Sequence, residues 1–225
     1  MIRPAAVAFD LDGTLIDSAP DIAAALNHAL DEERLPGLDL DVVRGMIGDG
    51  VRALILKALR RGGMDEEGGA RVQRMFDAFQ AFAARHPVTG TTIYPGMDAL
   101  LVRLEARGVR LAVVTNKTTG LAERILDRLD LARRFDIVIG GDGPWPLKPD
   151  PAGLLAALDG MGAALGASRY VGDMVIDLRT ARAAGVGFVG VDHGHWDRSC
   201  PELAGEIPAL GAAGLAARLG VGPAR

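Results

Sequence analysis

Five short apolar runs, rich in valine, isoleucine and phenylalanine, constrain the fold of this chain more than any other feature. Between the last four runs, leucine recurs every three or four residues, which is the spacing of one helix face. Strands that alternate with helices in this way predict a parallel sheet buried on both faces. We therefore expect an α/β fold with an open, doubly wound, Rossmann-like sheet, whose ligands bind at the carboxyl ends of its strands. The five predicted strands are 6–9, 110–115, 136–139, 170–172 and 186–191.

The connection between the first two predicted strands is far longer than a simple crossover requires. About 100 residues separate them, and the pattern between residues 18 and 93 is helical throughout. We expect a core domain formed by residues 1–17 and 94–225 and a helical insert formed by residues 18–93. The insert is predicted to contain a helix that begins at a capping box of Ser18 and Asp21, and helices over 42–59 and 72–82.

Composition narrows the class of ligand. Apolar residues make up 49% of the chain and charged residues 24%, the balance of an ordered globular protein. The net charge is −4 and no run of lysine or arginine occurs, so we expect no binding of nucleic acid or of an anionic membrane. Cys200 is the single cysteine, and no secretory or membrane-spanning segment is evident. We expect a cytoplasmic protein, monomer or homodimer, with a small molecule as its partner.

Two carboxylates follow the first predicted strand at an interval that places them on the same side of the chain. Asp10 and Asp12 stand in the stretch A6-V-A-F-D-L-D-G-T-L. Two such charges about 6 Å apart repel by roughly 3 kcal/mol at an effective dielectric constant near 20. A divalent cation with oxygen ligands would offset this repulsion, and Mg²⁺ fits because it takes carboxylates together with waters and phosphate.

Polar residues follow three further predicted strands as well. Thr115 and Asn116 follow the second strand, Lys148 follows the third, and Asp173 and Asp177 follow the fourth. Taken one at a time, each has a structural explanation as a turn, a helix cap or a solvated lysine. Together they bring carboxylates, a hydroxyl and an ammonium to one rim of one sheet, which predicts a functional site around a metal ion.

The four segments resemble, in order, the motifs of the haloacid dehalogenase superfamily of aspartate-nucleophile phosphatases. The motifs are D10-L-D-G-T-L, V-V-T115-N-K, Lys148 followed by proline, and G-D173-M-V-I-D177. The helical insert resembles the cap domain of that superfamily. The pattern as a whole is most similar to the phosphoglycolate phosphatase branch.

The resemblance implies a role for each of four residues in phosphoryl transfer. Asp10 would attack the phosphoryl group in line and form an aspartyl phosphate. Asp12 would protonate the leaving alkoxide and then take a proton from the hydrolytic water. Thr115 would donate its hydroxyl to a phosphoryl oxygen, and Lys148 would offset the charge around the transferring group. A dehalogenase has no use for an acid at the position of Asp12, so the chain resembles a phosphatase or phosphotransferase.

The resemblance also implies a set of ligands for Mg²⁺. The Asp10 carboxylate, the main-chain carbonyl of Asp12 and the Asp173 carboxylate would bind the ion directly. Asp177, one helical turn after Asp173, would bind it through water. Gly13 would let the backbone approach the phosphate closely.

Residues on the substrate side are expected from the same resemblance. Asn116 and Lys117 would contact the substrate. The segment I47-G-D-G-V-R52 resembles the glycine-containing cap segment of the phosphoglycolate phosphatase branch, so Arg52 is a candidate partner for a substrate carboxylate. The alternative is that Arg52 solvates a helix face.

The implied activity is Mg²⁺-dependent hydrolysis of a small phosphorylated metabolite, with 2-phosphoglycolate as the first expectation. A sugar-phosphate phosphatase, a phosphomutase on the same scaffold and a non-enzymatic phospho-aspartate switch are the alternatives. A switch needs neither a cap nor Asp12.

Further along the chain, His193, His195 and Asp197 alternate in D192-H-G-H-W-D197. This spacing is not diagnostic of a metal site, so we expect a polar loop that borders the active site.

Overall fold

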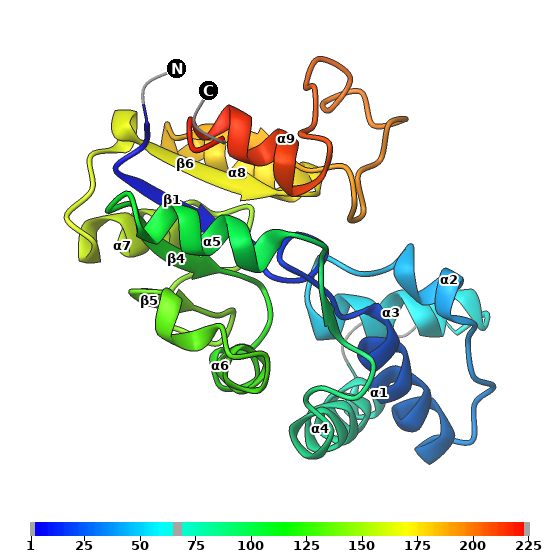
Figure 1. The fold of residues 1–225 in the computed structure, drawn as a ribbon. Helices are drawn as coiled ribbons and strands as arrows, with labels where there is room; N and C mark the ends of the chain where they lie inside the picture. Colours follow the sequence, from blue (N-terminus) through cyan, green and yellow to red (C-terminus); the bar gives the residue numbers. More distant parts are fainter. Residues whose placement is uncertain (1–2, 65–68, 223–225) are drawn as a thin grey trace. The chain divides into compact units, whose positions relative to one another are not determined.

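The chain folds into two compact units (Figure 1). The computed structural model describes residues 3–64 and 69–222. The core unit comprises Met1–Asp17 and Thr92–Arg225, and the inserted unit comprises Ser18–Thr91. Thr92 and Ile93, which are expected in the insert from the sequence, belong to the core unit. Among the described residues, no helix has both the length and the apolar character needed to cross a bilayer.

The core unit is built on a parallel sheet of five strands in the order β5-β4-β1-β6-β7. The prediction of a doubly wound α/β fold is confirmed, and the observed strand ends lie within two residues of the expected ones. The strands are β1 Ala6–Phe9, β4 Arg110–Val114, β5 Ile137–Ile139, β6 Ser168–Gly172 and β7 Gly187–Gly190.

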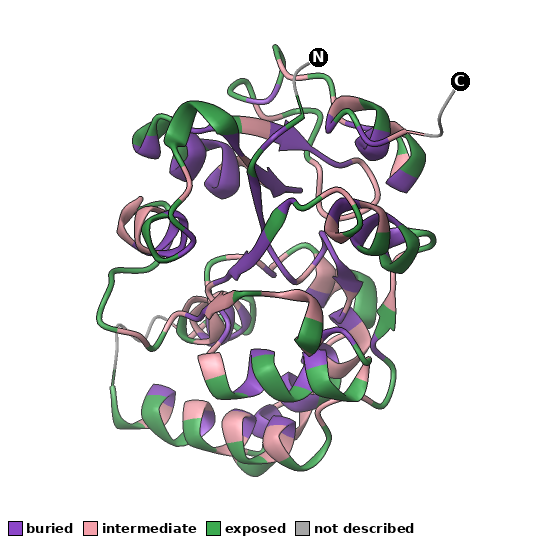
Figure 2. Ribbon diagram, turned by 60° about the vertical axis from the view of Figure 1, so that its left-hand side comes forward, coloured by how far each residue is buried: buried purple, intermediate pink, exposed green. Residues whose placement is uncertain are grey.

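Helices surround this sheet, and the strands at its centre are buried (Figure 2). Ala6 and Ala8 share an apolar core with residues of α7 and α8, whereas Val7 and Phe9 face the other side of the sheet because side chains alternate along a strand. Burial of a side chain the size of Phe9 contributes about 2 kcal/mol. The helices are α5 Met97–Glu105, α6 Thr119–Arg128, α7 Ala152–Gly160, α8 Val175–Ala184 and α9 Gly211–Arg218, with short 3₁₀ turns at Ala132–Arg134 and Leu165–Ala167.

A short antiparallel ribbon carries the connection to the inserted unit. It consists of β2 (Ile16–Asp17) and β3 (Thr92–Ile93), in which Ile16 pairs with Ile93 and Asp17 pairs with Thr92. The sequence does not predict this ribbon, because two residues are too few to show the alternation of a strand. The inserted unit therefore begins and ends next to one pair of hydrogen-bonded residues.

The inserted unit is helical, but the prediction of one of its helices is wrong. Its helices are α1 Ala19–Glu32, α2 Leu40–Arg44, α3 Val51–Arg61 and α4 Ala70–Arg85. The single helix expected over 42–59 is divided into α2 and α3. Gly48 and Gly50 lie between these helices with φ of 129° and 85°, a region that glycine adopts without strain and that no helix continues through.

The predicted capping box at the start of α1 is also wrong. The side chain of Ser18 makes no capping hydrogen bond. Asp21 instead accepts hydrogen bonds from the Thr91 hydroxyl at 2.6 Å and from the backbone N–H groups of Thr89, Gly90 and Thr91 at 3.0, 2.8 and 2.9 Å. Burial opposes ionisation of Asp21, but these donors outweigh it and hold its pKa below the usual value. Asp21 thus joins the first helix of the inserted unit to its last residues.

Candidate active site

The register of the sheet brings the ends of three strands to one edge. Phe9 of β1 lies beside Val113 of β4 and Val171 of β6, so the residues that follow these strands meet at the carboxyl edge. The chain passes from β1 to β4 and β5 on one side and returns to β6 and β7 on the other. Strand β1 therefore lies at the topological switch point, where open α/β sheets bind their ligands.

A triad of buried carboxylates occupies this edge. Asp10, Asp173 and Asp177 each offer an oxygen atom, and these atoms lie within 4.8 Å of one another. Burial is the main cause that raises the pKa of Asp10 to about 7, and the Asp177 and Asp12 charges add to it while Lys148 opposes. Burial, followed by the Asp177 and Asp10 charges, also raises the pKa of Asp173 well above its ordinary value. The protein groups alone therefore leave these carboxylates poorly compensated.

One ammonium lies among the carboxylates. The Nζ atom of Lys148 is 2.8 Å from Asp10 Oδ1 and 2.7 Å from Asp177 Oδ1. Burial lowers the pKa of Lys148, but the Asp10 and Asp177 charges outweigh it and hold the pKa well above the usual value. Lys148 is thus a fixed positive charge that contacts two members of the triad.

The charge and the donor set of this cluster fit a divalent cation. Three carboxylates face one ammonium, so two further positive charges would balance the cluster. The candidate donors are all oxygen atoms, which suits a hard ion such as Mg²⁺ or Ca²⁺ and not a thiolate-binding metal. In the described part of the chain, this is the cluster of acidic or metal-ligating side chains that could hold an ion.

Asp177 is held by protein donors on both oxygens. Its Oδ1 accepts from Lys148, and its Oδ2 accepts from the backbone N–H of Met174 at 3.1 Å. The Tyr170 hydroxyl lies 3.2 Å from Asp177 Oδ1, accepts from Lys148 Nζ at 3.1 Å and donates to the Val114 carbonyl at 2.9 Å. The sequence does not mark Tyr170 as a site residue, because it stands inside an apolar strand and resembles a core residue.

A second ion pair lies beside the triad. Lys117 Nζ is 3.2 Å from Asp12 Oδ2, and the Lys117 side chain is 7% exposed. Lys117 is predicted to contact the substrate, and in this structure its ammonium pairs with Asp12. A contact between Lys117 and a substrate stays a prediction.

Thr115 and Asn116 follow β4 and face different partners. The Thr115 hydroxyl accepts the backbone N–H of Lys117 at 3.2 Å, a bond that does not use the hydroxyl proton. Asn116 bonds both backbone groups of Lys148, accepting from its N–H at 2.8 Å and donating to its carbonyl at 3.3 Å. Asn116 therefore fixes the segment that delivers Lys148, a role that the sequence did not indicate.

Gly13 and Thr14 lie directly against Asp173. Gly13 has φ of 87°, and a Cβ at this position would lie 2.2 Å from Asp173 Oδ2, so no other residue fits. The Thr14 hydroxyl donates to Asp173 Oδ1 at 2.7 Å. Thr14 was not among the predicted site residues, although its hydroxyl stands two positions after Asp12 and could have drawn attention to it.

Arg52 lies in the inserted unit, at the start of α3. Its guanidinium donates to Gln73 Oε1 at 2.5 Å and stands over the ring of Phe76, 4.4 Å from the ring centroid. These partners belong to the inserted unit itself. The contact between Arg52 and a substrate carboxylate stays a prediction.

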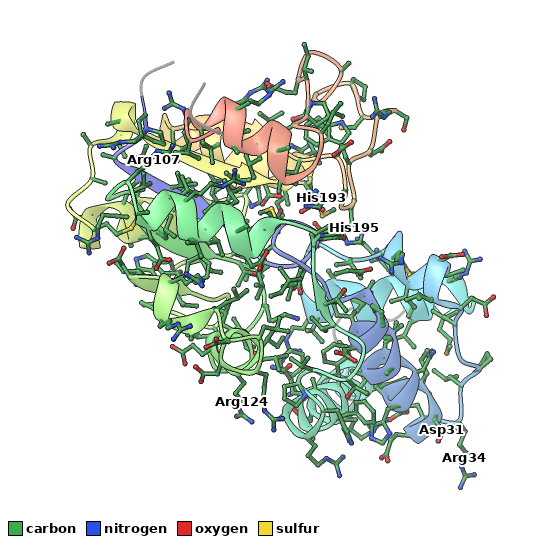
Figure 3. The ribbon with its side chains drawn as sticks, in the orientation of Figure 1. Asp31, Arg34, Arg107, Arg124, His193 and His195 are labelled. Atoms are coloured by element: carbon green, nitrogen blue, oxygen red, sulfur yellow. The ribbon has the colours of Figure 1, made fainter. Side chains whose placement is uncertain are left out.

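The loop after β7 reaches the carboxylate triad. His193 and His195 lie close together on this loop (Figure 3), and the backbone N–H of His195 donates to Asp173 Oδ2 at 2.6 Å. The sequence predicts a polar loop at the border of the site. The alternating histidines were its only local signal, and they did not reveal the contact with Asp173.

Known proteins match this chain over most of its length. A phosphoglycolate phosphatase of Rhodospirillum rubrum is 42% identical over 195 residues, which cover 85% of this chain and 81% of the relative. The crystal structure of a predicted phosphoglycolate phosphatase from Haemophilus somnus superposes with a TM-score of 0.81 at 28% identity, covering 91% of this chain and 92% of that one.

The fold alone does not select one reaction. The structure of Protein Tyrosine Kinase A from Mycobacterium tuberculosis also has a TM-score of 0.81, at 27% identity, and covers 98% of this chain and 100% of that one.

The resemblance to phosphatases of the haloacid dehalogenase superfamily, predicted from the four motifs, is confirmed by the comparisons. The model of the haloacid dehalogenase-like hydrolases matches residues 7–191, and the chain therefore belongs to this family of hydrolases.

Proposed function

We propose that this chain is a Mg²⁺-dependent phosphomonoester hydrolase that acts on 2-phosphoglycolate. The observation that carries the proposal is the buried triad of Asp10, Asp173 and Asp177 with Lys148 at the switch point of the sheet. The similarity to the Rhodospirillum rubrum phosphoglycolate phosphatase supports the choice of substrate. The cytoplasmic location and the monomeric or homodimeric state expected from the sequence stay predictions.

The proposed reaction proceeds in two displacements. In the first, an Asp10 oxygen forms a bond to phosphorus while the ester P–O bond breaks, and Asp12 gives its proton to the departing alkoxide. In the second, Asp12 takes a proton from a water molecule that attacks phosphorus, and the Asp10–phosphorus bond breaks to release inorganic phosphate. Asp10 and Asp12 are then back in their starting states.

The remaining residues of the site would stabilise the transferring phosphoryl group. Lys148 lies next to Asp10 and would offset negative charge on the equatorial oxygens. Thr115 has a hydroxyl proton to donate to one of these oxygens. The metal, held by Asp10, Asp173 and the main-chain carbonyl of Asp12, would supply further positive charge. Asp177 would keep Lys148 in place and reach the metal through water.

The test is phosphate release from a panel of phosphomonoesters that includes 2-phosphoglycolate and several sugar phosphates, with Mg²⁺ and with excess chelator. We expect release that depends on Mg²⁺ and is fastest for 2-phosphoglycolate. A preference for a sugar phosphate would keep the reaction and replace the substrate. No Mg²⁺-dependent release from any ester would contradict the proposal and favour the phosphomutase or the phospho-aspartate switch.

A further inference from the structure

Asp173 is clamped between two segments that are far apart in the sequence. Its Oδ1 accepts from the Thr14 hydroxyl at 2.7 Å, and its Oδ2 accepts from the His195 backbone N–H at 2.6 Å. The first donor follows β1 and the second follows β7. Because each carboxylate oxygen has two lone pairs, both oxygens keep the capacity to bind a cation.

The backbone at Gly194, in the second segment, lies very close to the carboxylate. A Cβ at Gly194 would lie 2.1 Å from the Gly13 carbonyl oxygen and 2.4 Å from Asp173 Oδ2. The loop can approach to this distance only because residue 194 has no side chain. Backbone conformation at Gly194 therefore determines where the His195 N–H points.

His193 fastens this loop to the same segment that carries Thr14. Its Nε2 lies 2.9 Å from the Thr14 carbonyl oxygen, and its ring packs on Tyr94 with centroids 4.1 Å apart. A carbonyl oxygen only accepts hydrogen bonds, so Nε2 must carry the hydrogen. Thr14 thus makes two contacts: its hydroxyl donates to Asp173 and its carbonyl oxygen accepts from His193.

These contacts form a closed circuit of Thr14, Asp173, the His195 backbone and His193. We propose that His193 is a positioning residue that holds the loop in register and so orients Asp173 for the cation. This inference rests on the proposed Mg²⁺ site. The circuit matters because the charges of Asp10 and Asp177 repel Asp173, and a carboxylate left without its clamp would turn away from the shared site. Loss of an outer contact of this kind lowers metal affinity by about 10-fold to 100-fold.

The test separates the hydrogen bond of His193 from its ring. His193→Phe keeps a ring on Tyr94 and removes the donor to Thr14, whereas His193→Gln keeps a donor and removes the ring. His86→Phe is the matched control, because His86 also packs on a ring, that of Phe82, and lies 3.1 Å from a carbonyl oxygen, in the inserted unit. Mg²⁺ binding is measured by titration calorimetry without substrate, and each melting temperature is measured in excess chelator.

We expect His193→Phe to weaken Mg²⁺ binding by about 10-fold or more, His193→Gln to retain most of the affinity, and His86→Phe to match the wild type. Wild-type affinity in His193→Phe would overturn the inference, and so would equal weakening in both His193 variants. If His193→Phe is unfolded in chelator, His193→Met is titrated instead, because it resembles His193→Gln in size but has no donor to Thr14; weaker binding than in His193→Gln is expected, and equal affinity in these two variants would overturn the inference. A wild-type protein that binds no Mg²⁺ would overturn the proposed metal site itself, which distinguishes that failure from this one.

Discussion

The position of one ammonium determines much of the electrostatics of the site at the scale of single residues. Lys148 contacts Asp10 and Asp177, and its side chain is 4% exposed. Removal of one partner from a buried ion pair is costly because the remaining charge cannot be solvated. Lys148 is therefore expected to stabilise the fold in addition to serving the reaction.

We expect Lys148→Met to lower the free energy of unfolding by about 3–5 kcal/mol in chelator. The reason is that Asp10 and Asp177 then stay buried without their cation. Lys57→Met is the control, because Lys57 pairs with Asp49 at 2.6 Å but both side chains are more than one third exposed. Lys57→Met should lower the free energy of unfolding by no more than about 1 kcal/mol. Urea denaturation measures the free energy of unfolding of both variants. An equal decrease in the two variants would contradict the prediction.

The nucleophile itself is tested by Asp10→Asn. The carboxamide keeps the shape of the side chain and cannot form the phosphoryl bond, so we expect kcat to fall by about a thousandfold or more. Asp130→Asn is the control, because the Asp130 side chain is 81% exposed and pairs with Arg133 at the surface. Phosphate release at saturating substrate is the measurement, and an Asp10→Asn protein with full activity would exclude this residue as the nucleophile.

The sequence predicts residues of the site when a polar side chain directly follows a strand, and it misses them when the residue stands inside an apolar strand or contributes only its backbone. Asp10, Thr115 and Asp173 could be placed together because parallel strands end at one edge. Tyr170 stands inside a strand and meets Lys148 across 22 positions of sequence, so no local pattern marks it. The backbone of His195 meets Asp173 through an N–H group that every residue except proline has, and residue type therefore carries no signal.

At the scale of elements, length decides what the sequence can predict. The five strands of the large sheet carry continuous apolar runs and were found with small errors at their ends. The two-residue strands β2 and β3 are too short for any periodicity. The helix expected over 42–59 failed because its apolar spacing continues through glycines whose backbone conformation ends a helix.

Asp21 gives an element-scale prediction that includes pH. We expect Asp21→Asn to lower the free energy of unfolding by about 1–2 kcal/mol at neutral pH, because a charged acceptor of several hydrogen bonds is lost. The pKa of Asp21 is 3.8 in the ordinary case and lower in the folded chain, so its contribution is complete above pH 3.8 and disappears as the pH falls through the lowered value.

Urea denaturation from pH 2 to 7 measures the difference in the free energy of unfolding between wild type and Asp21→Asn. Asp31→Asn is the control, because Asp31 is exposed on the same helix. A difference between Asp21→Asn and wild type that stays constant down to the lowest pH would show that the carboxylate charge is not the cause.

At the scale of the molecule, a bound cation and the fold should stabilise each other. A ligand that binds only the folded chain at 100 times its Kd adds about 2.7 kcal/mol, which raises Tm by about 5–10 °C in a protein of this size. We expect Mg²⁺ to raise Tm by this amount and Asp173→Asn to abolish the rise. Thermal denaturation with Mg²⁺, with chelator and with NaCl of equal ionic strength is the measurement. A rise of equal size in Asp173→Asn would place the ion elsewhere.

The ribbon of β2 and β3 has a consequence for how proteins of this architecture diversify. Asp17 and Thr92 are paired neighbours, so the chain leaves the core unit and re-enters it at nearly the same point. A tight turn of a few residues could close this gap as well as the whole inserted unit does. The inserted unit can therefore be lengthened, shortened or exchanged in evolution without disturbing the register of the five-stranded sheet, so the carboxylates and the lysine at the carboxyl edge of that sheet stay aligned.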